Sequence, residues 1–264
     1  GPEPTRHTVD VKASRHDMED TYFPAFRATV MEGKAESVMC AYNSINGEPA
    51  CANKDLLQQH LRGAWKFNGY VVSDCGAVTD VFEGHHFTKT MEEGSAAAFK
   101  TGTDLICSYP PDHAGFERDA LLKAVHEGFL SESDLDRSLQ RLFTARFKLG
   151  MFDPQSMVPF SSIKPEENDS EAHRQLALQT ARESIVLLKN KGNLLPLKTN
   201  YKTIAVVGPN ADSVDALVGN YNGTPSKPVT ILDGIRKRFP QTKVVYVEGT
   251  GLVGPVTKPV PSDA

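Results

Sequence analysis

Short apolar runs that end in polar residues alternate with amphipathic segments as far as residue 153, and this alternation constrains the fold more than any other feature. Glu36–Tyr42, Gly69–Asp74 and Thr103–Cys107 have the composition of buried strands. Lys54–Trp65 and Lys89–Thr101 space their apolar residues as helices do. Buried strands that alternate with helices predict a parallel sheet covered on both faces. A (β/α)8 barrel and a doubly wound sheet both satisfy this pattern.

Two more helices are expected at residues 116–127 and 132–149. Ser131 and Asp134 predict a capping box at the start of the second of these helices. Residues 154–170 then contain three prolines and little apolar periodicity, a composition that indicates a linker.

The linker separates an expected first domain, residues 1–153, from an expected second domain, residues 171–264. The second domain should contain, in order, a helix at 171–183, strands at 184–189 and 203–208, a short helix after Ala211, a helix at 231–239 and a strand at 243–248. The alternation stops before a domain of this type closes, and the opening GPEPTRHTVD lacks a Met. We therefore expect both ends to be cuts in a longer protein.

Composition excludes several classes of function. The net charge of −4 sets up no basic field, so nucleic acid and anionic membranes are not expected as partners. No segment approaches the roughly 18 consecutive apolar residues of a membrane helix. The four cysteines form no CxxC pair and are not bracketed by the histidines, so we expect neither a metal site nor a cofactor. Two disulfides in an exported protein and four buried thiols in a cytosolic one both remain open.

The segment GYVVSDCGAV contains the sharpest candidate for chemistry, because an apolar strand delivers Asp74 at its carboxyl end. In parallel α/β folds the loops after the strands converge there and form the active site. A carboxylate at that edge can act as a nucleophile, a general base or a metal ligand, or it can simply cap the next segment. AYNSING, which begins at the end of the neighbouring strand and contains Tyr42, adds polar residues to the same edge. Two convergent loops favour a functional role.

The sequence from Ser37 to Val78 resembles glycoside hydrolase family 3, whose members carry M-x-x-Y-N-x-x-N-G, then L-R-x-x-W-x-F-x-G, then V-S-D. Further matching pieces follow in the family's order at residues 102–104, 141–153, 181–197, 204–212 and 218–223. The resemblance therefore covers nearly the whole chain. It implies the C-terminal part of a (β/α)8 barrel followed by the start of an α/β sandwich domain.

The resemblance also implies a retaining, exo-acting β-glycosidase whose substrate is an oligosaccharide or aryl glycoside. Asp74 falls on the family's nucleophile, Tyr42 on a tyrosine beside it, and Arg6 on an arginine that binds sugar hydroxyls. A guanidinium fork suits vicinal hydroxyls, and a phenol can hold a carboxylate in place. The family's Lys-His pair and acid/base glutamate match nothing in this chain. The missing barrel and sandwich segments should come from the rest of the protein, and the chain alone should be inactive or poorly active.

Cys75 stands where many glucosidases of the family have Trp, and this variant resembles the β-xylosidase branch. The resemblance implies the disulfides Cys40–Cys51 and Cys75–Cys107, and hence an extracellular or periplasmic location. Losing an indole next to the nucleophile changes the pocket, so Cys75 also counts as a substrate-binding position. A pentose is favoured over glucose, with a β-glucosidase as the alternative.

Other residues have two interpretations each. His85 and His86 follow the catalytic strand, and His86 is taken as a substrate-binding candidate, although a solvated loop would look the same. Asp104 is expected to be a hydrogen-bonded residue at the same edge as Asp74. Two other classes of function also fit parts of the sequence. These are a non-catalytic carbohydrate-binding relic and, from the GPNAD turn at Gly208–Asp212 alone, a nucleotide-binding protein.

Overall fold

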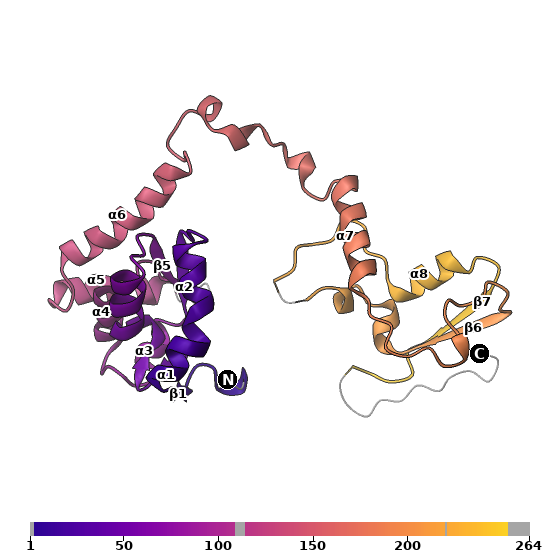
Figure 1. Cartoon of the computed structure of the whole chain (residues 1–264), viewed down its shortest axis with the longest axis horizontal. Coiled ribbons are helices and arrows are strands. Elements are labelled where there is room, and N and C mark those ends of the chain that lie inside the picture. Colours follow the sequence, from indigo (N-terminus) through magenta and orange to yellow (C-terminus); the bar gives the residue numbers. More distant parts are fainter. Residues whose placement is uncertain (1–2, 109–113, 220, 253–264) are drawn as a thin grey trace. The chain divides into compact units, whose positions relative to one another are not determined.

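The computed structural model describes residues 3–108, 114–219 and 221–252. The chain divides into two compact units, with the boundary between Ser161 and Ser162, and Figure 1 labels the α-helices and some of the strands of both. The boundary falls among three short 3₁₀ turns, η6 (Gln155–Met157), η7 (Pro159–Ser162) and η8 (Pro165–Glu167).

Parallel strands form the centre of the first unit, as the sequence predicts. β2 (Ser37–Cys40) pairs in parallel with β5 (Tyr70–Ser73), and Val38 lies opposite Val71. The third expected strand, Thr103–Cys107, is reduced to a single parallel bridge between Val72 and Leu105. The carboxyl ends of these three segments therefore lie at one edge.

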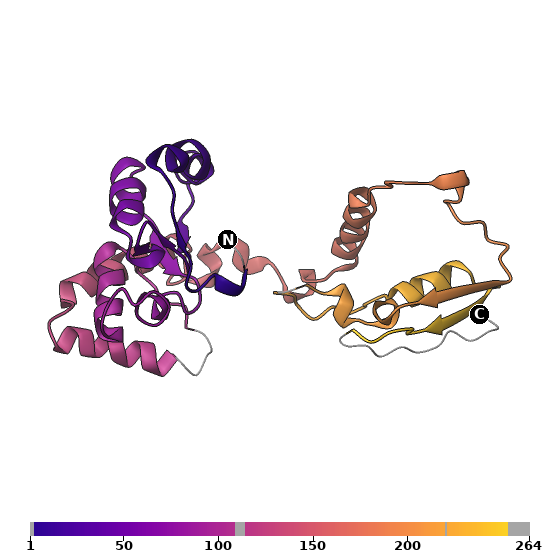
Figure 2. The same ribbon diagram turned by 90° about the horizontal axis from the view of Figure 1, so that it is seen from below.

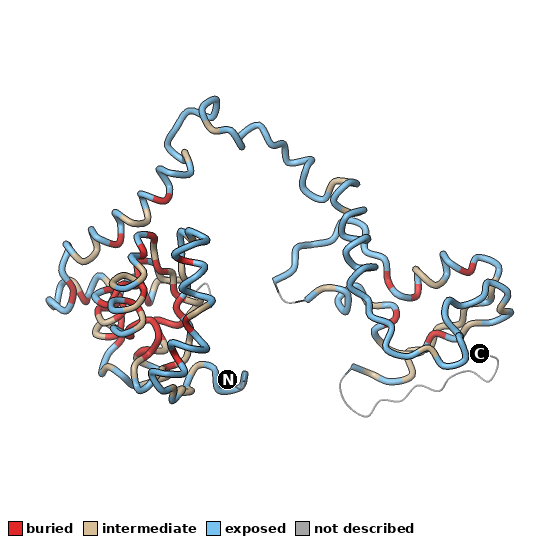
Figure 3. The backbone as a smooth tube through the Cα atoms, in the orientation of Figure 1, coloured by how far each residue is buried: buried red, intermediate tan, exposed pale blue. Residues whose placement is uncertain are grey.

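Four helices of the first unit occur where the apolar periodicity places them. They are η4 (Asp55–Ala64, with π-helical hydrogen bonds), α4 (Met91–Thr101), α5 (Ala114–His126) and α6 (Glu132–Lys148). The short helix α3 (Thr79–Phe82) was not expected from the sequence. Ser131 and Asp134 form the predicted capping box at the start of α6. The core packs β5 against η4 and α4, with Val71, Leu61 and Ala98 among its buried residues. Figure 3 shows this concentration of buried residues around β5 and α4.

The N-terminal part contains a helical stretch that the periodicity analysis missed. After η1 (Glu3–Thr5), three elements run on without a break, namely α1 (Arg15–Asp17), η2 (Met18–Tyr22) and α2 (Phe23–Met31). A capping box of Ser14 and Asp17 begins the stretch, so the sequence did contain a signal for it. A small second sheet consists of three strands in the order β1 (Asp10–Val11), β3 (Ser44–Ile45) and β4 (Glu48–Pro49).

One outer edge of the main sheet is open in the described part of the chain. β2 pairs with β5 on one side only, and the side chain of Met39 is 57% exposed. An apolar cleft of about 390 Å³ lies beside it, lined by residues that include Met18, Phe26 and Trp65. The expectation that this strand is buried is therefore wrong here, because burial of a parallel strand requires both faces of its sheet to be covered.

The second unit is a smaller α/β arrangement. β6 (Thr203–Val207) pairs in parallel with β7 (Lys243–Val247), and α8 (Ile231–Arg238) packs on them through Leu232. Figure 2 shows the two strands side by side with α8 along them. α7 (Glu171–Ser184) precedes this sheet and is largely exposed. The remaining elements are the 3₁₀ turns η9 (Lys191–Asn193), η10 (Pro209–Asp212) and η11 (Asp215–Leu217).

The strand expected at residues 184–189 is not formed. Residues 185–190 have no regular structure, and Leu188 is 92% exposed. Apolar composition alone does not make a strand, because a strand's backbone must also find a hydrogen-bonding neighbour. The short helix expected after Ala211 is likewise replaced by the two turns η10 and η11, so the GPNAD turn begins no α-helix that could bind a phosphate.

In the ranges that the structure describes, no helix has both the length and the apolar character needed to cross a bilayer. The Pro- and Gly-rich end of the sequence, residues 249–264, lies largely outside these ranges, since nothing after residue 252 is described.

Candidate active site

Asp74 directly follows β5 at the carboxyl edge of the sheet. Its backbone N–H donates to the carbonyl of Cys40 on the neighbouring strand, at 2.9 Å. Its carboxylate oxygen Oδ1 accepts a hydrogen bond from the backbone N–H of Cys75, at 2.7 Å. The side chain is half-buried, and one of its two oxygens is held by the chain's own backbone. The carboxylate is therefore oriented and still reachable from solvent.

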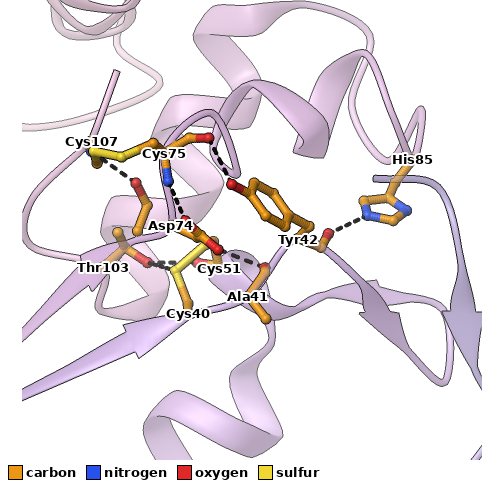
Figure 4. The surroundings of a disulfide bond; sticks show 10 residues. Cys40, Ala41, Tyr42, Cys51, Asp74, Cys75, His85, Thr103 and Cys107 are labelled. Carbon is orange, nitrogen blue, oxygen red and sulfur yellow. Dashed lines mark hydrogen bonds between the residues drawn. A yellow bond between two sulfur atoms is a disulfide. The ribbon is translucent and has the colours of Figure 1, made fainter. Parts of the chain in front are cut away.

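Tyr42 reaches the same edge from the end of β2. Its hydroxyl donates to the carbonyl oxygen of Cys75 at 3.2 Å, so it contacts the residue after Asp74 rather than the carboxylate itself. The Nε2 atom of His85 lies 2.7 Å from the Tyr42 carbonyl oxygen. Figure 4 shows Tyr42 between Cys75 and His85. The loops after the two neighbouring strands are thus tied together around Asp74.

The N-terminal segment brings the side chains of Arg6 and His7 to Tyr42. The guanidinium carbon of Arg6 lies 5.6 Å from the centroid of the Tyr42 ring, and Arg6 also pairs with Glu3. The ring centroid of His7 lies 4.3 Å from that of Tyr42, and Nδ1 of His7 lies 2.7 Å from Oδ2 of Asp80. The sequence analysis missed both members of this last pair.

Both expected disulfides are present, and together they include all four cysteines, so the open choice between bridges and thiols is decided. The Cα atoms are 5.1 Å apart in Cys40–Cys51 and 4.3 Å apart in Cys75–Cys107. The second bridge joins the residue after Asp74 to the third segment of the sheet. The backbone N–H of Cys107 also donates to Oγ of Ser73 at 2.9 Å. Two disulfides are consistent with an oxidising, extracellular location.

The two remaining candidates are His86 and Asp104. The side chain of His86 is exposed, and His85 is the histidine that contacts Tyr42. Asp104 is not at the edge with Asp74. It is fully buried beside the start of β5, where its Oδ2 accepts from the backbone N–H of Val71 at 2.8 Å. The reason is that Asp104 precedes its strand segment, whereas Asp74 follows β5.

Asp104 instead forms a structural ion cluster. Its two oxygens accept from Arg62 of η4 and from Arg141 of α6, each at 2.7 Å. Arg62 also donates to the carbonyls of Gly69 and Gly102. Burial lowers the pKa of Arg62, and the charge of Asp104 opposes that effect. Arg62 therefore joins a helix to the sheet. No group of three His, Cys, Asp or Glu side chains suited to a metal occurs in residues 3–108, 114–219 and 221–252.

Comparison with known families gives two matches. A profile described as "Glycosyl hydrolase family 3 N terminal domain" matches residues 3–145. A second profile, "Glycosyl hydrolase family 3 C-terminal domain", matches residues 185–260.

The chain is similar to curated β-xylosidases. "Xylan 1,4-beta-xylosidase" of Xylanibacter ruminicola is 43% identical over 253 residues, which are 96% of this chain and 29% of the relative. "Probable beta-D-xylosidase 7" of Arabidopsis thaliana is 42% identical over 249 residues, which are 93% of this chain and 31% of the relative. The chain thus spans less than a third of the length of these relatives.

Solved structures show the same likeness. The "GH3 exo-beta-xylosidase (XlnD) in complex with xylobiose aziridine activity based probe" superposes with a TM-score of 0.84 at 33% identity, covering 96% of this chain and 32% of the other. A β-glucosidase from Listeria innocua in complex with glucose gives a TM-score of 0.76 at 32% identity, covering 92% of this chain and 32% of the other.

Proposed function

This chain belongs to glycosyl hydrolase family 3, and we propose that it is the nucleophile-bearing part of a retaining, exo-acting β-xylosidase. The position of Asp74 carries the proposal. Its carboxylate stands at the carboxyl edge of parallel strands and is oriented by the Cys75 N–H, while the Tyr42 hydroxyl donates to the Cys75 carbonyl and Arg6 lies over the Tyr42 ring. Active sites of parallel α/β proteins form at this edge.

In this mechanism Asp74 attacks the anomeric carbon and forms a glycosyl-enzyme, which water then hydrolyses. Only one oxygen of a carboxylate is needed for attack, and the hydrogen bond from Cys75 to Oδ1 holds the group in one orientation. Retaining hydrolysis needs a second carboxyl group roughly 5–5.5 Å away as acid/base. We assign this group to a part of the protein outside the chain. Arg6 would bind sugar hydroxyls, and His86 stays a candidate for the pocket entrance.

The architecture that we propose is the C-terminal part of a (β/α)8 barrel over residues 1–153, a linker at 154–170 and the start of an α/β sandwich domain over residues 171–264. The parallel pairing of β2 with β5 and the bridge to Leu105 support the barrel. The open edge of β2 is where preceding barrel strands would pair.

We propose a pentoside as substrate, such as a xylo-oligosaccharide or aryl xyloside. The Cys75–Cys107 bridge stands beside Asp74, and Cys75 occupies the position where many glucosidases of the family have Trp. The curated relatives named above are xylosidases. A β-glucosidase is the second candidate, because a β-glucosidase from Listeria innocua that was solved in complex with glucose has a similar fold. Both disulfides support an extracellular protein.

The test is to label the nucleophile in the longer protein that contains this chain. A 2-fluoro-xyloside should form a stable adduct on Asp74, identified by peptide mapping. Asp74→Asn should lower kcat by roughly 10³-fold or more, because the covalent step is lost. Asp119→Asn is the matched control, since this exposed aspartate only pairs with its neighbour Arg118. A label on another residue would show that Asp74 is not the nucleophile.

Kinetic and binding measurements on the same protein distinguish a β-xylosidase from the alternative functions. A larger kcat/KM for aryl β-xyloside than for aryl β-glucoside is expected, and the opposite order would identify a glucosidase. Binding of both sugars without any turnover would identify a non-catalytic relic.

A further inference from the structure

The short segment that carries Arg6 and His7 rests on the loop and helix that follow Asp74. His7 and Asp80 are 73 positions apart in the sequence, yet Nδ1 of His7 lies 2.7 Å from Oδ2 of Asp80. The other side of the His7 ring packs against Tyr42. Arg6, the next residue, lies over the same tyrosine ring. One side-chain pair thus anchors the residue adjacent to the expected sugar-binding arginine.

Gly84 makes a second, independent contact with this segment. A Cβ atom built on Gly84 would lie 2.3 Å from the carbonyl oxygen of His7 and 3.0 Å from Oδ1 of Asp80. The backbone of His7 therefore approaches closer than any side chain at position 84 would allow. The N–H of Gly84 also donates to the carbonyl oxygen of Asp80, which keeps the two residues together.

The environment of Asp80 makes the contact with His7 necessary. The side chain of Asp80 is only 13% exposed. Burial raises the pKa of Asp80 above its usual value, and the hydrogen bond from His7 opposes that rise. A carboxylate so far from solvent needs a donor, and His7 supplies one. The proposed hydrolysis uses neither residue.

A continuous set of contacts then leads from this pair to the nucleophile. His7 packs on Tyr42, the hydroxyl of Tyr42 donates to the Cys75 carbonyl, and the Cys75 N–H donates to Asp74. We propose that His7 and Asp80 are positioning residues, which hold Arg6 over Tyr42 so that its guanidinium faces the sugar hydroxyls. This inference rests on the proposed function. Neither residue touches the sugar.

The experiment uses the longer protein and compares an aryl β-xyloside with its deoxy analogues, each lacking one ring hydroxyl. In the wild type, the analogue that lacks the hydroxyl bound by Arg6 should react about 10- to 100-fold more slowly in kcat/KM, the value of a hydrogen bond to a charged group. Arg6→Ala should abolish this penalty. Asp80→Leu should shrink it to a few-fold and raise KM for the parent xyloside by about tenfold, which corresponds to the loss of one such bond.

Matched variants separate positioning from general damage. Asp80→Asn keeps the shape and can still accept from His7, so it should retain most of the discrimination. The double variant His7→Phe with Asp80→Leu should recover more of it than Asp80→Leu alone, because removing both partners leaves no unpaired buried group. Gly84→Val should reduce discrimination through the backbone of His7. Asp119→Leu on the exposed face of α5 is the control that should change nothing.

The outcomes are distinct. A wild type that hydrolyses no β-glycoside would overturn the proposed function and this inference with it. A wild type that hydrolyses the xyloside, together with folded Asp80→Leu and Gly84→Val variants that keep the full penalty for the missing hydroxyl, would overturn this inference alone. If Asp80→Leu does not fold, the double variant and Gly84→Val decide the same question.

Discussion

Removing the Cys75–Cys107 bridge should destabilise the first unit more than removing the Cys40–Cys51 bridge. Cys75 and Cys107 are separated by 32 positions in the sequence, whereas Cys40 and Cys51 are separated by 11. The loop-closure entropy restored to the unfolded chain is then worth about 3.7 kcal/mol for the long loop and about 2.8 kcal/mol for the short one. Because the two loops do not overlap in sequence, these costs should be separately measurable in two double Cys→Ser variants.

Hydrogen exchange of the backbone amides in β5 measures this difference without interference from other domains, since it reports the opening of the unit that contains them. Ser73 is a suitable probe, because its N–H donates to the Leu105 carbonyl inside the sheet. Exchange there should accelerate about 500-fold without Cys75–Cys107 and about 100-fold without Cys40–Cys51, at 1.36 kcal/mol for each factor of ten. Equal acceleration, or a larger effect of the short loop, would refute the loop-length argument. In that case native packing around the bridges would be the dominant contribution.

Three further predictions follow from particular contacts. Asp104→Leu should lower the free energy of unfolding of the first unit by about 3–5 kcal/mol, since it leaves Arg62 and Arg141 as unpaired charges. If urea unfolding shows a decrease below about 1 kcal/mol, water replaces Asp104 as the partner of the two arginines. Hydrogen bonding from Ser131 lowers the pKa of Asp134 from 3.8 to about 2, so the capping carboxylate stabilises the fold above pH 3.8 and loses that effect as the pH falls towards 2. Asp134→Ala should therefore cost about 1 kcal/mol at neutral pH and nothing below pH 2, and a cost that persists at pH 2 would contradict this assignment. The 264-residue chain expressed alone should cleave xylobiose roughly 10²–10⁴-fold more slowly than the longer protein, because it lacks the acid/base; rapid cleavage by the chain alone would place that group within it.

Local and periodic features were predictable from the sequence. The α6 helix begins directly after its N-cap residue Ser131, as the capping box predicts, and β5 ends at the residue before Asp74. These features depend on residues close together in the chain, and their energetics are local. The order of motifs from Tyr42 to residue 223 identified the family, and the resemblance supplied the disulfide pairing that spacing alone left open.

Contacts between distant segments were decided by the tertiary structure. The sequence could not indicate that His7 meets Asp80, that His85 rather than His86 contacts Tyr42, or that Asp104 lies away from Asp74. Each depends on which distant segments of the chain come together in the fold, and no local pattern in the sequence specifies that.

Residues 184–189 show that an apolar sequence suited to a strand need not form one. Their apolar, β-branched composition determines that they favour extended backbone, but a strand exists only when another strand supplies hydrogen-bonding partners for it. Residues 185–190 remain irregular, whereas the similar run in β6 pairs with β7. For this protein the sequence by itself determined which residues are suited to strands, caps and chemistry. The tertiary structure decided which of them have partners, because pairing is a property of two segments and is encoded in neither one alone.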